Sequence, residues 1–147
     1  MANKRIGLGM LVIALVFGMT VVGCVSSGRT PKNFVRGSSG DTTILLRQGL
    51  DFDLAFREVA FALNRHGFET EAIQPEVGYI RTRWNRWDST TSIDAYRVRI
   101  VCNFNPSRTQ LIVKAEAEWL IRDEWVQGYD SRAIETLRND LNNIIGN

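Results

Sequence analysis

The sequence predicts an α+β domain in which an antiparallel β-sheet of four or five strands carries two helices on one face. Residues 96–104 and 111–121 alternate between apolar and polar side chains, as strands do when one face packs and the other meets water. Two other segments repeat their apolar residues at spacings of three and four, as amphipathic helices do. The expected order of elements is β-α-β-β-β-β-α.

The two helices are expected at residues 51–67 and 131–145. Asp51 places negative charge at the start of the first helix, where the helix dipole favours it, and Gly67 can adopt the left-handed conformation that ends a helix. Asp130 and Ser131 are both candidate caps for the second helix. The apolar stripes are Phe52, Phe56, Val59 and Leu63 in the first helix, and Ile134, Leu137, Leu141 and Ile144 in the second.

The remaining strands are expected at residues 42–47, 68–73 and 77–84. The two alternating strands should form a hairpin around the loop 105–108. Pairing Phe104 with Thr109 gives each apolar residue an apolar partner and sets Arg97 opposite Glu116, which is a favourable cross-strand pair. This register is the one that the sequence predicts.

The N-terminal segment has the composition of an export signal. Lys4 and Arg5 precede a long apolar stretch without charge, which ends in Gly23 and Cys24. This arrangement resembles the signal of bacterial lipoproteins, whose cysteine carries a diacylglyceryl thioether. In that family a peptidase cuts before the cysteine, and the new amine is usually acylated, for example with palmitate. The resemblance implies that residues 1–23 are removed and that lipid on Cys24 anchors the protein, since two or more acyl chains hold stably.

An uncleaved transmembrane helix is the alternative, because the charge-free sequence from Ile6 to Gly28 is long enough to span a bilayer. Glycines interrupt this run, and the Gly-Cys pair lies where a lipoprotein signal needs it, so the lipoprotein is favoured. Val25 follows the cysteine, where an aspartate commonly retains proteobacterial lipoproteins at the inner membrane. By this resemblance the outer membrane is favoured, with the protein facing the periplasm of the cell envelope.

The segment after the signal is rich in glycine and serine, so residues 24–40 are expected to be the lipidated N-terminus and a flexible tether. Arg29, Lys32 and Arg36 give this tether three positive charges and no acid. Such charges are either ordinary linker charges or contacts to anionic lipid headgroups. Residues 41–147 are expected to form a single globular domain.

Charge and composition argue against a nucleic-acid partner. The chain has 18 basic and 16 acidic residues, and the signal takes away Lys4 and Arg5, so the mature protein carries 16 of each. From Asp41 onward, 13 basic residues face 16 acidic residues. A nucleic-acid-binding domain normally carries a clear basic excess.

Residues suited to catalysis are scarce. His66 is the only histidine and should interact with the end of the first helix. Cys102 has no disulfide partner once Cys24 carries lipid, and it should be buried and unreactive. Asp123 and Glu124 are expected to be solvated charges in a loop. The sequence therefore predicts no enzyme, no metal site and no cofactor.

Two features are candidates for binding. The residues concerned are Arg81, Arg83, Arg97, Arg99 and Trp87. The four arginines should share the outer face of the sheet, where they would meet an anionic partner or be neutralised by Glu116 and Glu118. Trp84 is expected to pack inward, whereas Trp87 is either exposed at an interface or folded over the sheet edge.

A family resemblance covers residues 54–84. A helix that ends in Gly67 and Phe68, followed by a strand and then Gly-x-Ile-x-Thr-x-Trp at 78–84, looks like the helix-grip domains of small envelope lipoproteins. One of these is the lipoprotein C subunit of the outer-membrane β-barrel assembly machinery. The resemblance implies the fold and the location, and suggests an accessory role in envelope assembly.

Two functions follow as hypotheses. The first is a non-catalytic envelope lipoprotein that binds another protein through the sheet face or the Trp87 loop. The alternative is a binder of a small amphiphile or lipid between the sheet and the helices. A cavity lined by Phe52, Phe56 and Tyr96 would favour the alternative.

Overall fold

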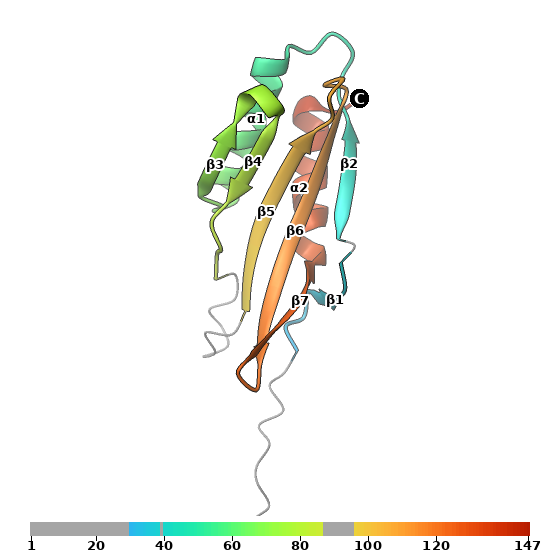
Figure 1. Cartoon of the computed structure of the whole chain (residues 1–147). Helices are drawn as coiled ribbons and strands as arrows, with labels where there is room; N and C mark the ends of the chain where they lie inside the picture. The colour runs from blue at the N-terminus through green and yellow to red at the C-terminus, as the bar shows by residue number, and fades with distance from the viewer. Residues whose placement is uncertain (1–29, 39, 87–95) are drawn as a thin grey trace, which may run out of the picture.

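The computed structural model describes residues 30–38, 40–86 and 96–147. Within these residues the chain forms one seven-stranded antiparallel sheet and two α-helices, which lie side by side behind one face of the sheet (Figure 1). The predicted α+β class and antiparallel sheet are confirmed. The strand count is higher than expected because the structure adds β1 and β7.

The elements follow one another along the chain as two strands, a helix, five strands and a helix. The strands are β1 (Phe34–Arg36), β2 (Asp41–Leu45), β3 (Thr70–Gln74), β4 (Tyr79–Thr82), β5 (Tyr96–Phe104), β6 (Gln110–Ile121) and β7 (Glu124–Asp130). The helices are α1 (Phe52–Arg65) and α2 (Ser131–Ile145), and a 3₁₀ turn, η1 (Pro75–Val77), separates β3 from β4. The 3₁₀ turn delays the start of β4 from the expected residue 77 to residue 79.

Strand β6 organises the sheet. It pairs with β5 along nearly its whole length on one side. On the other side it pairs first with β2, over residues 110–114, and then with β7, over residues 116–121. Between these two partners the backbone N–H of Ala115 donates to the carbonyl of Gly40 at 3.3 Å. The spatial order is β1-β7-β6-β5-β4-β3, with β2 beside β6.

The β5–β6 hairpin is shifted by two residues from the expected register, which was therefore wrong. Phe104 lies opposite Leu111 instead of Thr109. The side chain of Asn105 causes the shift, since its Oδ1 accepts hydrogen bonds from the backbone N–H groups of Thr109 and Gln110 at 2.8 and 3.0 Å. Because the shift is an even number of residues, every side chain keeps its expected face.

Helix α1 begins and ends as the sequence predicts. The carboxylate of Asp51 caps the helix by accepting a hydrogen bond from the N–H of Leu54 at 2.9 Å. Gly67 has a φ of 78°, the left-handed conformation expected after the helix end. The predicted stripe faces the core, with three of its residues buried and Phe52 partly buried.

Helix α2 has the predicted bounds but a slightly rotated buried face. Asp130 caps it by accepting a hydrogen bond from the N–H of Ala133 at 2.7 Å. The buried residues are Ala133, Leu137, Leu141 and Ile145. Ile134 and Ile144 are partly buried and pack against the core, so the predicted stripe faces the core, with Leu137 and Leu141 fully buried.

The expected tether does not extend to residue 40, because residues 34–36 form β1 and pair with β7. The ring of Phe34 packs edge-on against Tyr96 and Trp119, at centroid distances of 6.0 and 5.9 Å. Gly128 provides the space for this contact. A segment that looks like a linker by composition is thus held by strand pairing and by one partly buried aromatic side chain.

Replacing Gly128 by alanine is expected to destabilise the fold by about 1–3 kcal/mol, because the new methyl group would overpack the β1–β7 contact. A Cβ at this position would lie 2.6 Å from the Phe34 ring. Urea unfolding followed by tryptophan fluorescence measures the loss. Gln127→Ala is the matched control, because this exposed neighbour on β7 should change stability by less than about 0.5 kcal/mol. Equal stability of the two variants would contradict the docking of β1.

Candidate functional site

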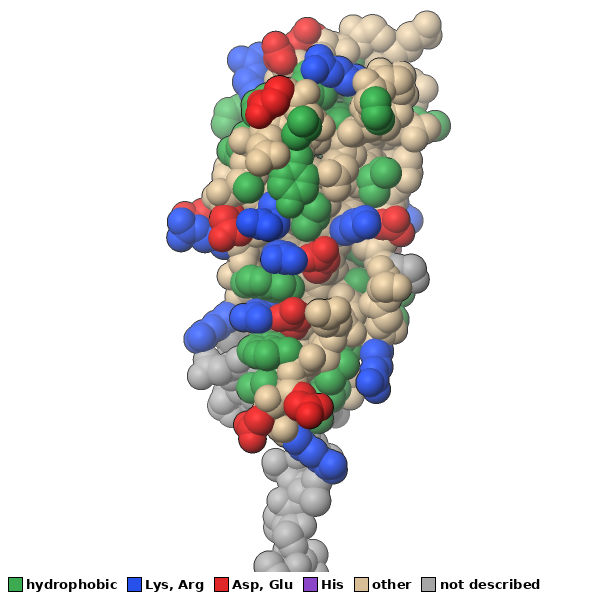
Figure 2. All heavy atoms as spheres, viewed as in Figure 1, with side chains coloured by type: hydrophobic (Ala, Val, Ile, Leu, Met, Phe, Trp, Pro, Cys, Tyr) green, Lys and Arg blue, Asp and Glu red, His purple; other side chains and the backbone are tan. Residues whose placement is uncertain are grey.

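The face of the sheet that carries no helix is the candidate site. Figure 2 looks onto this face and shows basic and acidic side chains alternating across its middle, with apolar groups above and below. Strand alternation directs these side chains outward, since their neighbours along β5 and β6 are buried against the helices. The residues that β5 and β6 contribute are Arg97, Arg99, Val101, Asn103, Ile112, Lys114, Glu116 and Glu118.

The two arginines of β5 each pair with a glutamate directly opposite on β6. Arg97 lies opposite Glu118 and contacts its carboxylate at 2.6 Å through Nη2 and 2.8 Å through Nε. Arg99 lies opposite Glu116, with Nε 2.6 Å from the carboxylate oxygen. The register shift therefore gives both arginines acidic partners, whereas the expected register paired only one.

The two arginines near β4 also have acidic neighbours. Arg81 lies 3.2 Å from the carboxylate of Glu71 on β3, and Arg83 lies 4.0 Å from that of Glu69. These partly exposed pairs contribute little to stability, at most about 1 kcal/mol each. The main consequence of these pairs is neutralisation: the four arginines carry no excess charge with which to attract an anion.

Trp84 joins the arginines on the outer face, so the expectation that it packs inward was wrong. The guanidinium carbons of Arg97 and Arg99 lie 4.8 and 4.5 Å from its ring centroid. Arg97 also lies over Trp125 of β7, at 4.1 Å. We call Trp84, Arg97, Arg99 and Trp125 the Trp-Arg cluster. Such cation–π contacts stabilise by about 0.5–1 kcal/mol each at exposed sites.

The reversal of Trp84 has a local cause at the end of β4. Thr82 is buried, and its hydroxyl takes the place of a ladder carbonyl by accepting a hydrogen bond from the N–H of Ile100 at 2.8 Å. Regular pairing with β5 resumes only at Asn85, which bridges to Val98. Two residues, Arg83 and Trp84, therefore lie between Thr82 and Asn85, where regular alternation has one residue between neighbouring inward positions. The extra residue places Trp84 on the outer face.

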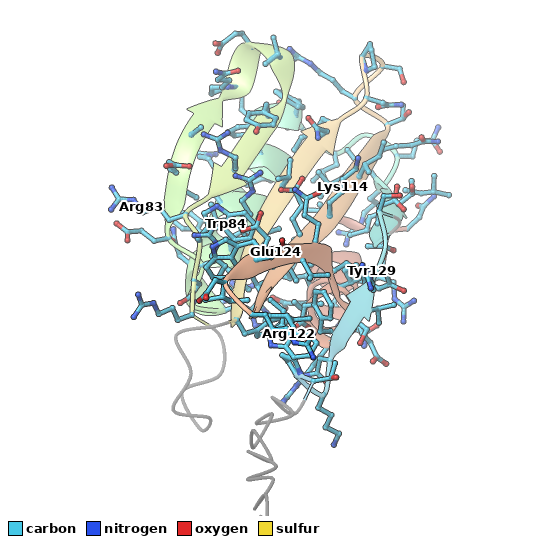
Figure 3. All side chains as sticks on the ribbon, turned by 60° about the horizontal axis from the view of Figure 1, so that its bottom comes forward. Arg83, Trp84, Lys114, Arg122, Glu124 and Tyr129 are labelled. Carbon is cyan, nitrogen blue, oxygen red and sulfur yellow. The ribbon has the colours of Figure 1, made fainter. Side chains whose placement is uncertain are left out.

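A hollow of about 230 Å³ lies beside the Trp-Arg cluster. Its lining residues are Gly37, Ser38, Trp84, Arg99, Glu116, Ala117, Glu118, Gln127 and Gly128. Ligand pockets usually exceed about 300 Å³. The hollow suits a single side chain of a partner better than a whole cofactor. Figure 3 shows Trp84 of this cluster beside the β6–β7 hairpin, where Glu124 is labelled.

The residues expected to line a ligand cavity do not meet at one place. Phe52 and Phe56 pack against Phe104, at centroid distances of 5.2 and 5.9 Å. Tyr96 starts β5 and contacts Phe34, whereas Phe104 ends the same strand, about 27 Å away for eight strand steps. A second hollow, of about 350 Å³, opens beside Phe52 at the end of the sheet and does not include Tyr96.

The other residues singled out from the sequence have structural contacts. Cys102 is fully buried, and burial raises the pKa of its thiol to about 12. His66 caps the end of α1, as expected, by donating its backbone N–H to the carbonyl of Ala62, and its Nε2 lies 3.0 Å from the carboxylate of Asp140 on α2. Asp123 has a φ of 66° in the β6–β7 turn, and Glu124 begins β7. Within the described residues no three potential ligands gather as a metal site.

Two predicted functional residues, Cys24 and Trp87, lie outside the described residues. Among the residues that are described, no helix has the length and apolar character needed to cross a membrane. No protein-family model matches the chain, and no match was found among curated proteins.

Trp125 is the functional candidate that sequence reasoning missed. It lies on β7, and the signal for that strand was present. Trp125, Gln127 and Tyr129 alternate with Val126 and Gly128, directly after a two-residue turn whose second residue is an aspartate. Asp tolerates the left-handed conformation that such hairpin turns require.

Replacing Asp140 by asparagine is expected to remove a pH-dependent contact between the helices. Burial alone would raise the pKa of Asp140, but hydrogen bonds from Arg65 and His66 outweigh it and lower the pKa. A carboxyl group whose pKa is lower in the folded state stabilises the fold at pH values above its unfolded-state pKa, which is about 3.9. This stability is lost as the pH falls through the pKa of the folded state. At neutral pH the free energy of unfolding of the wild-type protein should therefore exceed that of Asp140→Asn by at most about 1 kcal/mol.

Thermal unfolding of both proteins across acidic and neutral pH measures this difference, which should vanish at the lowest pH. Glu135→Gln is the control, because Glu135 is exposed on the same helix. A difference between wild type and Asp140→Asn that stays constant with pH would contradict the assignment.

Proposed function

We propose that this chain is an envelope lipoprotein, held to a membrane by lipid on Cys24, whose folded domain binds another protein through the helix-free face. The observation that carries the proposal is the Trp-Arg cluster beside a hollow of about 230 Å³. Tryptophan and arginine are enriched among residues that dominate binding energy at protein interfaces. No catalytic step is part of the proposal.

The charge pattern of the face favours a protein over a simple anion. Each of the four arginines already has a carboxylate within 4.0 Å. An incoming phosphate would have to compete with these glutamates, whereas an aromatic or apolar side chain can use the exposed rings without breaking an ion pair. The hollow beside Trp84 has room for one such side chain.

The anchor rests on the sequence. Lys4 and Arg5, the apolar stretch and the Gly23-Cys24 pair support export and lipid attachment. Val25 supports the outer membrane, and the resemblance to helix-grip envelope lipoproteins supports an accessory role in envelope assembly. The alternative function, an amphiphile held between sheet and helices, has less support because Phe52 and Phe56 pack against Phe104.

A photo-crosslinking residue in place of Gln127, which lines the hollow, is expected to capture a protein partner in membranes of the native host. Trp84→Ala should reduce this adduct by about tenfold or more, which corresponds to the loss of a hot-spot contact of over 1 kcal/mol. Phe61→Ala is the control, because Phe61 is 59% exposed on α1, in the layer behind the sheet.

A crosslinker in place of Arg57, on the exposed side of α1, tests whether capture depends on the face. Circular dichroism should show that both alanine variants remain folded. Equal capture from Arg57 and Gln127, or an adduct that Trp84→Ala leaves unchanged, would count against the proposed surface.

The mature N-terminus is expected to begin at Cys24 and to carry a diacylglyceryl group and an amide-linked acyl chain. Mass spectrometry of the N-terminal peptide measures this, and fractionation should place the protein in the membrane. Cys24→Ala should prevent lipid attachment, because no thiol remains to form the thioether. A mature N-terminus without lipid would rule out the proposed anchor.

A further inference from the structure

The chain enters the domain at one end, which we call the entry end, and different elements lie at the opposite end. Figure 1 shows β1 and the β6–β7 turn at the lower end, near the entry of the chain, and the β5–β6 loop and the C-terminus at the upper end. Figure 3 turns the lower end forward and shows Arg122, in the β6–β7 turn, at this end of the domain. An anchor that precedes β1 is therefore attached to this end.

The chain between the anchor and the domain is short. The described residues begin at Thr30, so six residue steps separate it from Cys24 and reach at most about 20 Å. The twelve residues of β6 span about 40 Å. The tether is therefore shorter than the domain, so the entry end stays within about 20 Å of a membrane in which Cys24 is anchored, whereas the opposite end can lie up to about 60 Å away.

Positive charge gathers at the entry end. Lys32 lies just before β1, Arg36 ends β1, and Arg122 lies in the β6–β7 turn; all three are exposed, and no ion pair is present for them within the described residues. Residues 24–40 contain no acid, and among the described residues the turn adds two exposed acids at this end, Asp123 and the neighbouring Glu124. The cations outnumber these acids.

We propose that this entry end, through Lys32, Arg36 and Arg122, docks on the anionic headgroups of the membrane that holds Cys24. The proposal rests on the lipid anchor of the proposed function and adds an orientation to it. The sheet stands upright on the bilayer, so the helix-free face points sideways along the membrane. A partner then approaches from beside the domain.

Fluorescence quenching on vesicles tests the orientation. The lipidated protein is purified from membranes and reconstituted into vesicles of phosphatidylcholine with phosphatidylglycerol, with a nitroxide on the lipid headgroup. A thiol-reactive fluorophore is placed at Asp123→Cys, in the lower turn, or at Ser107→Cys, in the upper loop. Cys102 is buried and should not react, and Cys24 carries lipid.

The label at position 123 is expected to be quenched several times more than the label at position 107. This difference should shrink in phosphatidylcholine alone and at high salt, because surface attraction to anionic lipid is screened. Replacing Lys32, Arg36 and Arg122 together by glutamine should have the same effect, since each cation contributes roughly fivefold to the docking equilibrium.

Replacing Arg47, Arg57 and Arg138 together by glutamine makes the same change in net charge at exposed positions away from the entry end, and this control should quench as the wild type does. Equal quenching of the two labels, or quenching at 123 that ignores both phosphatidylglycerol and the first triple variant, would overturn the docking while leaving the anchor intact. An N-terminal mass without lipid on Cys24 would overturn the proposed anchor together with the docking.

Discussion

The rest of the structure depends on the unequal division of β6 between its neighbours. One edge of this strand belongs to β5, and the other edge is shared by β2 and β7. Because β7 occupies only the second half, the first half is left for β2. The N-terminal segment therefore pairs first with β7 through β1, then crosses over and pairs with β6 through β2. The crossing point is tight, and Gly40 packs there against the ring of Tyr129.

A single buried carboxylate ties this sheet to the helix layer. Asp130 ends β7 and caps α2, and its second oxygen accepts a hydrogen bond from the hydroxyl of Tyr96 at 2.6 Å. Charge-assisted bonds of this kind are shorter and stronger than neutral ones. The same tyrosine contacts Phe34. One cluster thus fixes the start of α2, the start of β5 and the segment by which the chain enters the domain.

The sequence predicts the parts of this fold whose patterns are long. Helix α2 and β5 have the predicted bounds, and α1 and β6 lie within a few residues of theirs, because fourteen or more periodic helical residues and nine or more alternating residues give an unambiguous period. Strand β1 has three residues in a glycine- and serine-rich context, and its formation depends on the distant contact between Phe34 and Trp119. No local pattern encodes such a contact.

The sequence predicted two of the four members of the Trp-Arg cluster, Arg97 and Arg99, but not the arrangement of the site. Alternation placed the arginines of β5 on the outer face, but their partners depended on the hairpin register, which the side chain of Asn105 sets. Trp84 depended on the hydroxyl of Thr82, which interrupts the ladder. Each error came from one side chain that replaced a backbone partner. Propensity and periodicity carry no information about side chains that take the place of a backbone hydrogen-bond partner.

The pairing of arginine with glutamate explains how an aromatic face can remain exposed without a cover. Arg97 lies between Trp84 and Trp125, and its charge is balanced by Glu118. The guanidinium group shields part of both rings from water, while the balanced charge gives little long-range attraction to acids or nucleic acids. If the face binds a partner as proposed, the binding energy comes from short-range contact with these rings and not from long-range attraction.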